Sequence, residues 1–325
     1  MRAVTQDVFG EPQQVLGVSE LERPEPGPGE VRLRVVLSPI HNHDLWTARG
    51  TYGFKPSLPA RAGTEAVAMI DALGEGVEGL ELDQRVATGG TFGAWAEFVT
   101  AKAAGLIPVP DALPDEAAAQ LVAMPFSAIS LLDSLGLEEG DWLVQNAANG
   151  AVGRMVAQLG AARGINVVGL VRRAAGVEEL REQGIERVVA TDAEGWRDEV
   201  AAITGGAPIR VGIESVGGKA AGDVLSLLAE GGELVAFGAM AAPVMEIASG
   251  DVIFKQATVR GFWGSKVSGA MGADDKRRLF GELLQRIGSG ELTLPVAAIF
   301  PLERVAEAAE ASFTAGRVGK VLLKP

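Results

Sequence analysis

The stretch Asp141-Trp-Leu-Val-Gln-Asn-Ala-Ala-Asn-Gly-Ala-Val-Gly153 decides the fold. Its apolar start, Trp142–Asn146, is typical of a buried strand, and helical spacing of apolar residues begins at about Val152. The turn of small residues between them lets backbone N–H groups approach a pyrophosphate at the positive end of the next helix dipole. A plain strand–helix turn is the alternative, because only part of the G-x-G-x-x-G pattern is present. The stretch predicts these residues of a dinucleotide site: Asn146, Asn149, Gly150, Ala151, Val152 and Gly153.

The chain around this stretch alternates strands with helices. Apolar runs rich in β-branched residues predict strands, and segments with helical spacing separate them. The predicted strands are 142–146, 165–171, 188–190, 211–215 and 234–237, and the predicted helices are 152–162, 177–183, 196–203 and 219–229. Runs that are apolar throughout favour parallel strands covered on both faces, so we expect a doubly wound α/β sheet of Rossmann type.

The two flanks of this region have a different pattern. Apolar and polar residues alternate from Val31 to Leu37, and a short helix is expected over Asp44–Arg49 before Gly50. Further short strand signals predict a mostly β domain, and Val321–Leu323 predicts a last strand that rejoins it. We therefore expect two domains, a mostly β domain from 1–118 and 257–325, and an inserted nucleotide-binding domain from 119–256.

The end of the second predicted strand of the inserted domain indicates which nucleotide is bound. NAD-selective domains carry an acidic residue about 20 residues after the glycine turn, where it bonds the ribose hydroxyls. Here the strand ends in Arg172 and Arg173, with no carboxylate. Guanidinium groups suit a 2′-phosphate by charge and by bidentate geometry, so we predict NADPH as the cofactor. A solvated basic loop is the alternative.

The composition argues against several classes of function. A net charge of −13 disfavours nucleic acid as a partner. The absence of cysteine excludes a disulfide framework, thiolate catalysis and a thiolate metal site. No apolar run approaches the roughly 20 residues that span a bilayer, and Met1–Phe9 lacks the pattern of a signal peptide. We expect no membrane span and a cytoplasmic location.

Several motifs in the same order resemble the medium-chain dehydrogenase/reductase superfamily over essentially the full length. They are 44–50, Gly63-Thr-Glu-Ala66, Asn146–Gly153, Phe237-Gly-Ala-Met240 and Gly319-Lys-Val-Leu-Leu323. The chain is most similar to the zinc-independent quinone oxidoreductases and the mitochondrial-type 2-enoyl thioester reductases. The second group is suggested by Arg49-Gly-Thr-Tyr-Gly-Phe-Lys-Pro56, Gln145–Asn149 and Gly261-Phe-Trp263.

This resemblance implies a GroES-like catalytic domain, an inserted Rossmann domain, an active site in the cleft between them and a homodimer formed through the Rossmann sheets. It also places Gly238 and Met240 beside the nicotinamide. Phe262 and Trp263 would form the other wall, with core packing as the alternative. Lys320 would be a cation on the cofactor side, with surface solvation as the alternative.

The zinc-dependent members of the superfamily offer a test against residues. At the position of their first zinc ligand this chain has His41, and at the position of their second it has Thr64-Glu65. A catalytic zinc needs three protein ligands, of which at most one survives, so we expect no metal. The pair His41 and His43 has a common metal-ligand spacing, but two histidines that line the substrate cleft are the favoured interpretation.

Tyr52, the only tyrosine in the chain, occupies the place of the catalytic tyrosine in the enoyl thioester reductases. A phenol can donate a hydrogen bond to a developing enolate oxygen or deliver a proton. An aromatic wall residue near the cleft is the alternative. His43 is a second catalytic candidate, because it falls where zinc enzymes carry a proton-relay hydroxyl and where relatives carry a small polar residue.

Together these features predict an NADPH-dependent, zinc-free oxidoreductase. It would transfer hydride to the β-carbon of an α,β-unsaturated carbonyl compound, an enoyl thioester or an enone. An NADPH:quinone oxidoreductase is the first alternative, and an NADPH-binding protein with a structural or regulatory role is the second.

Overall fold

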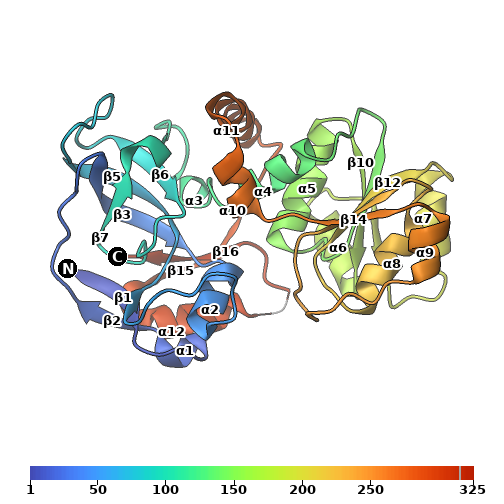
Figure 1. Ribbon diagram of the computed structural model, residues 1–325, viewed down its shortest axis with the longest axis horizontal. Helices are drawn as coiled ribbons and strands as arrows, with labels where there is room; N and C mark the ends of the chain where they lie inside the picture. The colour runs from blue at the N-terminus through green and yellow to red at the C-terminus, as the bar shows by residue number, and fades with distance from the viewer. Residues whose placement is uncertain (315) are drawn as a thin grey trace. The chain divides into compact units, whose positions relative to one another are not determined.

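The computed structural model of the protein describes residues 1–314 and 316–325, and these form two compact units (Figure 1). Unit 1 comprises Met1–Met124 and Leu294–Pro325, and unit 2 comprises Pro125–Thr293. The sequence places the boundaries after residues 118 and 256, whereas the structure places them after 124 and 293. The second boundary differs because 258–261 extends the sheet of unit 2 by one strand.

Unit 1 contains two sheets. The first has the order β2-β1-β4, and the second has the order β15-β16-β3-β5-β6-β8, with β7 also paired to β3. The strands are β1 Arg2–Gln6, β2 Gly17–Glu20, β3 Glu30–Pro39, β4 Ala60–Arg61, β5 Glu65–Leu73, β6 Arg85–Gly89, β7 Phe98–Lys102, β8 Ile107–Pro108, β15 Val296–Pro301 and β16 Lys320–Lys324. The helices are α1 Pro12–Val15, α2 Asn42–Arg49, α3 Asp115–Ala118 and α12 Val305–Ser312, with 3₁₀ turns η1 Ala103–Gly105 and η2 Leu302–Arg304.

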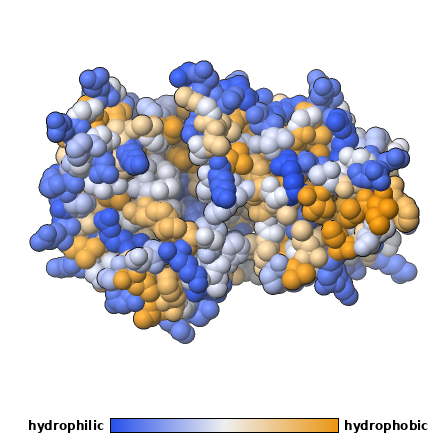
Figure 2. Space-filling model, viewed as in Figure 1, coloured by the Kyte–Doolittle hydropathy of each residue, from blue (hydrophilic) through white to orange (hydrophobic). Residues whose placement is uncertain are grey.

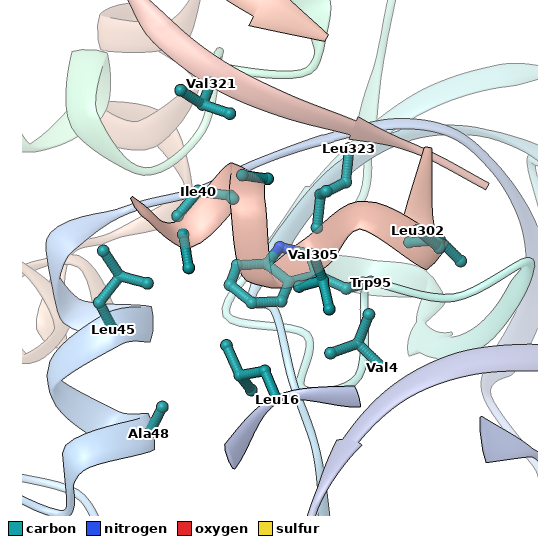
Figure 3. Packing of buried hydrophobic residues seen from close by; sticks show 12 residues of the cluster. Val4, Leu16, Ile40, Leu45, Ala48, Trp95, Leu302, Val305, Val321 and Leu323 are labelled. Atoms are coloured by element: carbon teal, nitrogen blue, oxygen red, sulfur yellow. The ribbon is translucent and has the colours of Figure 1, made fainter. Parts of the chain in front are cut away.

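One core of unit 1 joins segments from opposite ends of the sequence (Figure 3). Trp95 is 1% exposed, and its indole nitrogen donates to the carbonyl of Pro39 at 3.1 Å. The cluster around it contains Val4, Leu16, Ile40, Leu45, Ala48, Leu302, Val305, Ala308, Ala309, Val321 and Leu323. Strand β16 pairs with β3 through Leu323 and Ser38, so the predicted last strand does rejoin the first part of the chain (Figure 1). This core fixes the start of α2, which carries several candidate site residues.

Unit 2 is a six-stranded parallel sheet with the order β11-β10-β9-β12-β13-β14. Its strands are β9 Trp142–Gln145, β10 Asn166–Val171, β11 Val188–Ala190, β12 Ile209–Glu214, β13 Glu233–Ala236 and β14 Thr258–Gly261. Its helices are α5 Ala151–Ala162, α6 Ala174–Arg181, α7 Trp196–Thr204, α8 Lys219–Leu227, α9 Ser249–Phe254, α10 Gly264–Ala270 and α11 Ala273–Gly288, and α4 Met124–Asp133 precedes the sheet.

The sheet of unit 2 is apolar throughout its central strands, as the sequence predicts. Val144, Val168 and Leu234 are completely buried and pack with residues of α7 and α8, while α5 and α6 cover a second cluster around Val171. The α/β fold class with a doubly wound parallel sheet is therefore confirmed. No helix among residues 1–314 and 316–325 is long and apolar enough to cross a membrane.

Candidate active site

The predicted cofactor residues of unit 2 gather at one edge of its sheet. Because all the strand pairs are parallel, their carboxyl ends lie at the same edge. Asn146 follows β9, Arg172 follows β10, Gly238 lies two residues after β13, and Phe262 follows β14. Strand β9 has β10 on one side and β12 on the other, so the strand order reverses at the predicted turn. Ligands of open α/β sheets bind at such a switch point.

The turn between β9 and α5 is shaped by close backbone approach. Ala147 adopts the left-handed conformation with φ 49°, and Gly150 is the N-cap of α5. A Cβ atom on Gly153 would lie 2.7 Å from the carbonyl oxygen of Ala147 and 2.8 Å from the Cα of Ala148, so only glycine fits there. No side chain caps α5. The N–H groups of its first turn are thus left for an anion, as the sequence predicts.

Asn146 connects the ends of two strands. Its amide nitrogen donates to Glu214 Oε1 at 3.0 Å, and its amide oxygen accepts from the backbone N–H of Ser215 at 2.7 Å. Glu214 is fully buried and accepts two further backbone N–H bonds, from Val216 and Gly217, each at 2.6 Å. Both ends of the Asn146 amide are therefore engaged within the protein, and the residue holds the turn to the end of β12.

Arg172 and Arg173 lie between β10 and α6, and Arg173 is the N-cap of α6. Both side chains are exposed. Neither forms an ion pair with a residue that the structure describes, so both guanidinium groups are free to meet a phosphate. Their place at the end of the second strand matches the predicted position of a 2′-phosphate.

The loops after β13 and β14 complete this edge of unit 2. Gly238 and Met240 pack against the segment after β12, and the N–H of Met240 donates to Ser215 O at 3.0 Å. Phe262 is 6% exposed and stacks on Phe237, which favours the core-packing alternative for this ring. Trp263 is 43% exposed, so it is the aromatic side chain of the predicted pair that a ligand can reach.

The catalytic candidates of unit 1 lie at the two ends of α2. His43 is in the first turn of α2, and Tyr52 follows the helix after Gly50, which has the left-handed conformation at the C-cap. The ring centroids of His43 and Tyr52 are 5.7 Å apart. His43 Nε2 is 2.7 Å from Thr64 Oγ1, and Thr64 Oγ1 donates to Asp44 Oδ1 at 2.7 Å. The structure thus brings the two candidates together and adds two polar residues behind His43.

A second group of polar side chains in unit 1 is buried. His41 Nε2 is 2.6 Å from Glu65 Oε2, and Glu65 Oε1 accepts from the backbone N–H groups of Val122 and Ala123 at 2.5 and 2.8 Å. Burial raises the pKa of Glu65 to about 7, and burial lowers the pKa of His41 well below its usual range. His41 is therefore a neutral imidazole at physiological pH.

Lys320 belongs to the same part of unit 1. It is 7% exposed, so the surface-solvation alternative is wrong for this side chain. Burial and the charge of Arg317 lower the pKa of Lys320 to about 8, while the charges of Asp44 and Glu65 oppose that shift. Its ammonium group therefore has carboxylates of unit 1 nearby. Whether it also serves the cofactor stays a prediction.

Comparison with known proteins then decides the family. Residues 27–111 match the family model described as alcohol dehydrogenase GroES-like domain, and residues 151–278 match the model described as zinc-binding dehydrogenase. The mitochondrial enoyl-[acyl-carrier-protein] reductase of Homo sapiens is 33% identical over 319 residues, which are 96% of this chain and 85% of that protein. The chain belongs to the medium-chain dehydrogenase/reductase superfamily.

Solved structures narrow the position of the chain within the superfamily. The quinone oxidoreductase of Escherichia coli, solved in complex with NADPH, is 25% identical over all of both chains with a TM-score of 0.89. A mycobacterial protein solved in complex with NADPH is 26% identical over all of both chains, with a TM-score of 0.86. Together with the similarity to the human enoyl reductase, the quinone oxidoreductase match confirms the predicted quinone oxidoreductase and enoyl reductase branch of the superfamily.

The zinc-ligand places of the superfamily are filled differently in this chain. His41 points its Nε2 at Glu65, and His43 points its Nε2 at Thr64. The two imidazole rings stack with centroids 5.0 Å apart. No group of three or more His, Cys, Asp or Glu side chains that could hold a metal ion occurs among residues 1–314 and 316–325. The polar groups at this place bond to one another.

Sequence reasoning missed the supporting residues of both units. Glu214 stands at the end of an apolar strand, where a carboxylate has to find buried partners, and this was an available signal. Asp44 and Thr64 were visible only as parts of motifs. Thr64 contacts both His43 and Asp44 from about 20 positions along the chain, and no local pattern specifies these contacts.

Proposed function

We propose that the protein is an NADPH-dependent reductase of the carbon–carbon double bond in α,β-unsaturated carbonyl compounds, either enoyl thioesters or enones. Bound NADPH supplies the hydride, which the β-carbon of the substrate receives. The observation that carries the proposal is Tyr52, the only phenol of the chain, beside His43 in a unit that resembles the enoyl reductases.

The residues of unit 2 fit the phosphates of NADPH. The N-terminus of α5 lacks a side-chain cap, and Gly153 leaves the space that a pyrophosphate needs near the backbone. Arg172 and Arg173 would bind the 2′-phosphate through charge-assisted hydrogen bonds. Trp263 would lie against the cofactor or the acceptor as an apolar surface.

Tyr52 would act on the acceptor. Hydride addition at the β-carbon places negative charge on the carbonyl oxygen and the α-carbon, and a phenol O–H can stabilise the first or protonate the second. In this proposal, His43 neighbours the Tyr52 ring and does not contact the β-carbon of the substrate.

A quinone is the second candidate acceptor, because the Escherichia coli structure with a TM-score of 0.89 is a quinone oxidoreductase. NADPH oxidation should be followed in parallel with a crotonyl thioester, a simple enone and a quinone. We expect the highest kcat/KM with an enoyl thioester or an enone. Faster reaction with the quinone would assign the second function, and tight NADPH binding without oxidation by any acceptor would assign a structural or regulatory role.

We also propose that two copies associate through unit 2. Strand β14 is the edge of its sheet, and Ile253 and Phe254 of the preceding helix α9 are 57% and 83% exposed. Val244 of the same unit is 66% exposed. Figure 2 shows an apolar area on unit 2 in the region of α9. Such an apolar patch on a protein surface favours association. Light scattering should give twice the mass of the chain, and Phe254→Glu should give a single chain.

A further inference from the structure

The hydrogen bonds behind His43 fix which of its nitrogens carries a proton. Thr64 has one hydroxyl hydrogen, and it is donated to Asp44 Oδ1 at 2.7 Å. The same oxygen, 2.7 Å from His43 Nε2, must therefore accept there. Nε2 thus holds its hydrogen in every protonation state of the ring. Any proton that His43 exchanges must enter and leave at Nδ1.

Nδ1 is the nitrogen of His43 that remains available for proton exchange. It has no hydrogen bond to a residue that the structure describes, and the side chain of His43 as a whole is 20% exposed. The phenol of Tyr52 is the neighbouring proton carrier, with ring centroids 5.7 Å apart. The two groups have no direct hydrogen bond in this structure, so one water or a rotation of Tyr52 would join them.

Ionisable side chains from several elements lie around His43. Asp44 Oδ1 lies 3.5 Å from Nε2, and the Asp44 side chain is 2% exposed. His41 stacks on the ring at 5.0 Å, but burial lowers its pKa, so it is neutral and does not repel a second charge. Glu65 from β5, Lys320 from β16 and Arg317, which precedes β16, are further titratable groups of this region.

Resting on the proposed function, we propose that His43 is a catalytic residue that returns a proton to Tyr52 after each reduction, with Thr64 and Asp44 as its positioning residues. The phenol O–H bond breaks as the enolate electron pair forms the new α-carbon–hydrogen bond. The phenolate oxygen then takes the proton from Nδ1 of the imidazolium, whose electron pair stays on nitrogen. Solvent then protonates Nδ1 again, while the Nε2–H group of His43 remains hydrogen-bonded to Thr64 throughout.

The test is rescue of a His43→Ala variant by added imidazole. We expect kcat with the preferred acceptor to fall about 30-fold and the NADPH dissociation constant to stay unchanged, because the missing group only moves a proton. Imidazole should restore most of the lost rate, whereas sodium chloride of equal ionic strength should not. A kcat within about twofold of wild type, or a loss that imidazole leaves in place, would overturn the proposal.

Two further variants separate this proposal from the proposed function. In the double variant His43→Ala with Tyr52→Phe, imidazole should have no effect, because no phenolate remains to be protonated. A rate increase by imidazole there would mean direct action on the substrate and would also overturn the relay. If wild type reduces no enoyl thioester or enone, the proposed function fails. If the wild type is active, Tyr52→Phe is slow and His43→Ala has the wild-type rate, then the proposed function stands and only the proton relay is refuted.

Thr64 tests the positioning role. Thr64→Val keeps the shape of the side chain but leaves Nε2 without its acceptor, so kcat should fall about 10-fold, while Thr64→Ser should stay near wild type. Equal rates for the two variants would contradict a hydroxyl that holds the ring.

Discussion

The end of β9 in unit 2 and the start of α2 in unit 1 solve the problem of holding a reacting group in opposite ways. The turn after β9 is made of backbone, since Gly153 and Gly150 contribute space and N–H groups. The site at α2 is made of side chains, since His43, Thr64 and Asp44 contribute the polar atoms. The first region therefore requires the absence of a side chain at Gly153, whereas the second requires particular functional groups on its side chains.

This difference teaches what kind of damage each region tolerates. Loss of a polar side chain at the α2 site removes a chemical group but leaves the apolar core of unit 1 unchanged. Addition of one atom in unit 2 displaces the backbone and so weakens every contact that the turn makes with a ligand. The variants below are expected to affect catalysis in the first region and affinity in the second.

Tyr52→Phe should have the largest effect. We expect kcat with an enoyl thioester or an enone to fall about 1,000-fold, because the variant lacks the only phenol that can donate a proton. The NADPH dissociation constant, measured by fluorescence titration, should stay within about twofold of wild type. An unchanged kcat would remove Tyr52 from the reaction.

Gly153→Ala should produce the reverse pattern. Its Cβ would lie 2.7 Å from a backbone oxygen, so the turn must shift, and we expect NADPH to bind about 100-fold more weakly. Gly150→Ala is the graded control, because its Cβ would approach the same oxygen only to 3.1 Å. Titration of both variants, with thermal unfolding as a check of folding, measures the effect. Equal affinity in Gly153→Ala and wild type would refute the backbone account of the turn.

Replacement of Arg172 and Arg173 by alanine should change the choice of nucleotide. We expect kcat/KM for NADPH to fall about 30-fold and that for NADH to stay the same, because only NADPH carries the 2′-phosphate. Arg181→Ala is a control at the C-terminal end of α6, away from the predicted phosphate position, where the arginine pairs with Glu178. A parallel loss with both nucleotides would show that the two arginines do not read the phosphate.

Glu65 should give the smallest effect, a pH dependence of stability. Its pKa in the folded protein is about 7, above the ordinary value of 4.5, so the folded state binds more protons than the unfolded state between these pH values. The stabilisation is therefore present below pH 4.5 and is lost as the pH rises through 7. Relative to Glu65→Gln, wild type should lose about 2 kcal/mol of unfolding free energy between pH 5 and pH 8. Urea unfolding at both pH values measures this, and a constant difference would contradict the assignment.

The two regions also differ in how far their sequences predict them. The turn after β9 follows from local rules, since small residues between an apolar strand and a helix leave few other structures, and its residues lie where they were expected. The site at α2 depends on β5 lying beside β3, which brings Thr64 and Glu65 to the start of the helix. The positions of His43 and Tyr52 within superfamily motifs predict them as catalytic candidates. The motifs do not predict that Asp44 and Thr64 support His43, because contacts between distant segments are set by strand register and packing.

The pairing of β16 with β3 has a consequence for how the chain is made. Ser38 can pair with Leu323 only when nearly the whole described chain has been synthesised. Until then the core around Trp95 also lacks Leu302, Val305 and Val321. The parallel sheet of unit 2 needs only residues from one continuous segment. On the ribosome, unit 2 can therefore fold while the first 124 residues still lack their closing strand. Nascent chains from which residue 293 has just emerged from the ribosome should already protect unit 2 from protease and leave unit 1 open to cleavage.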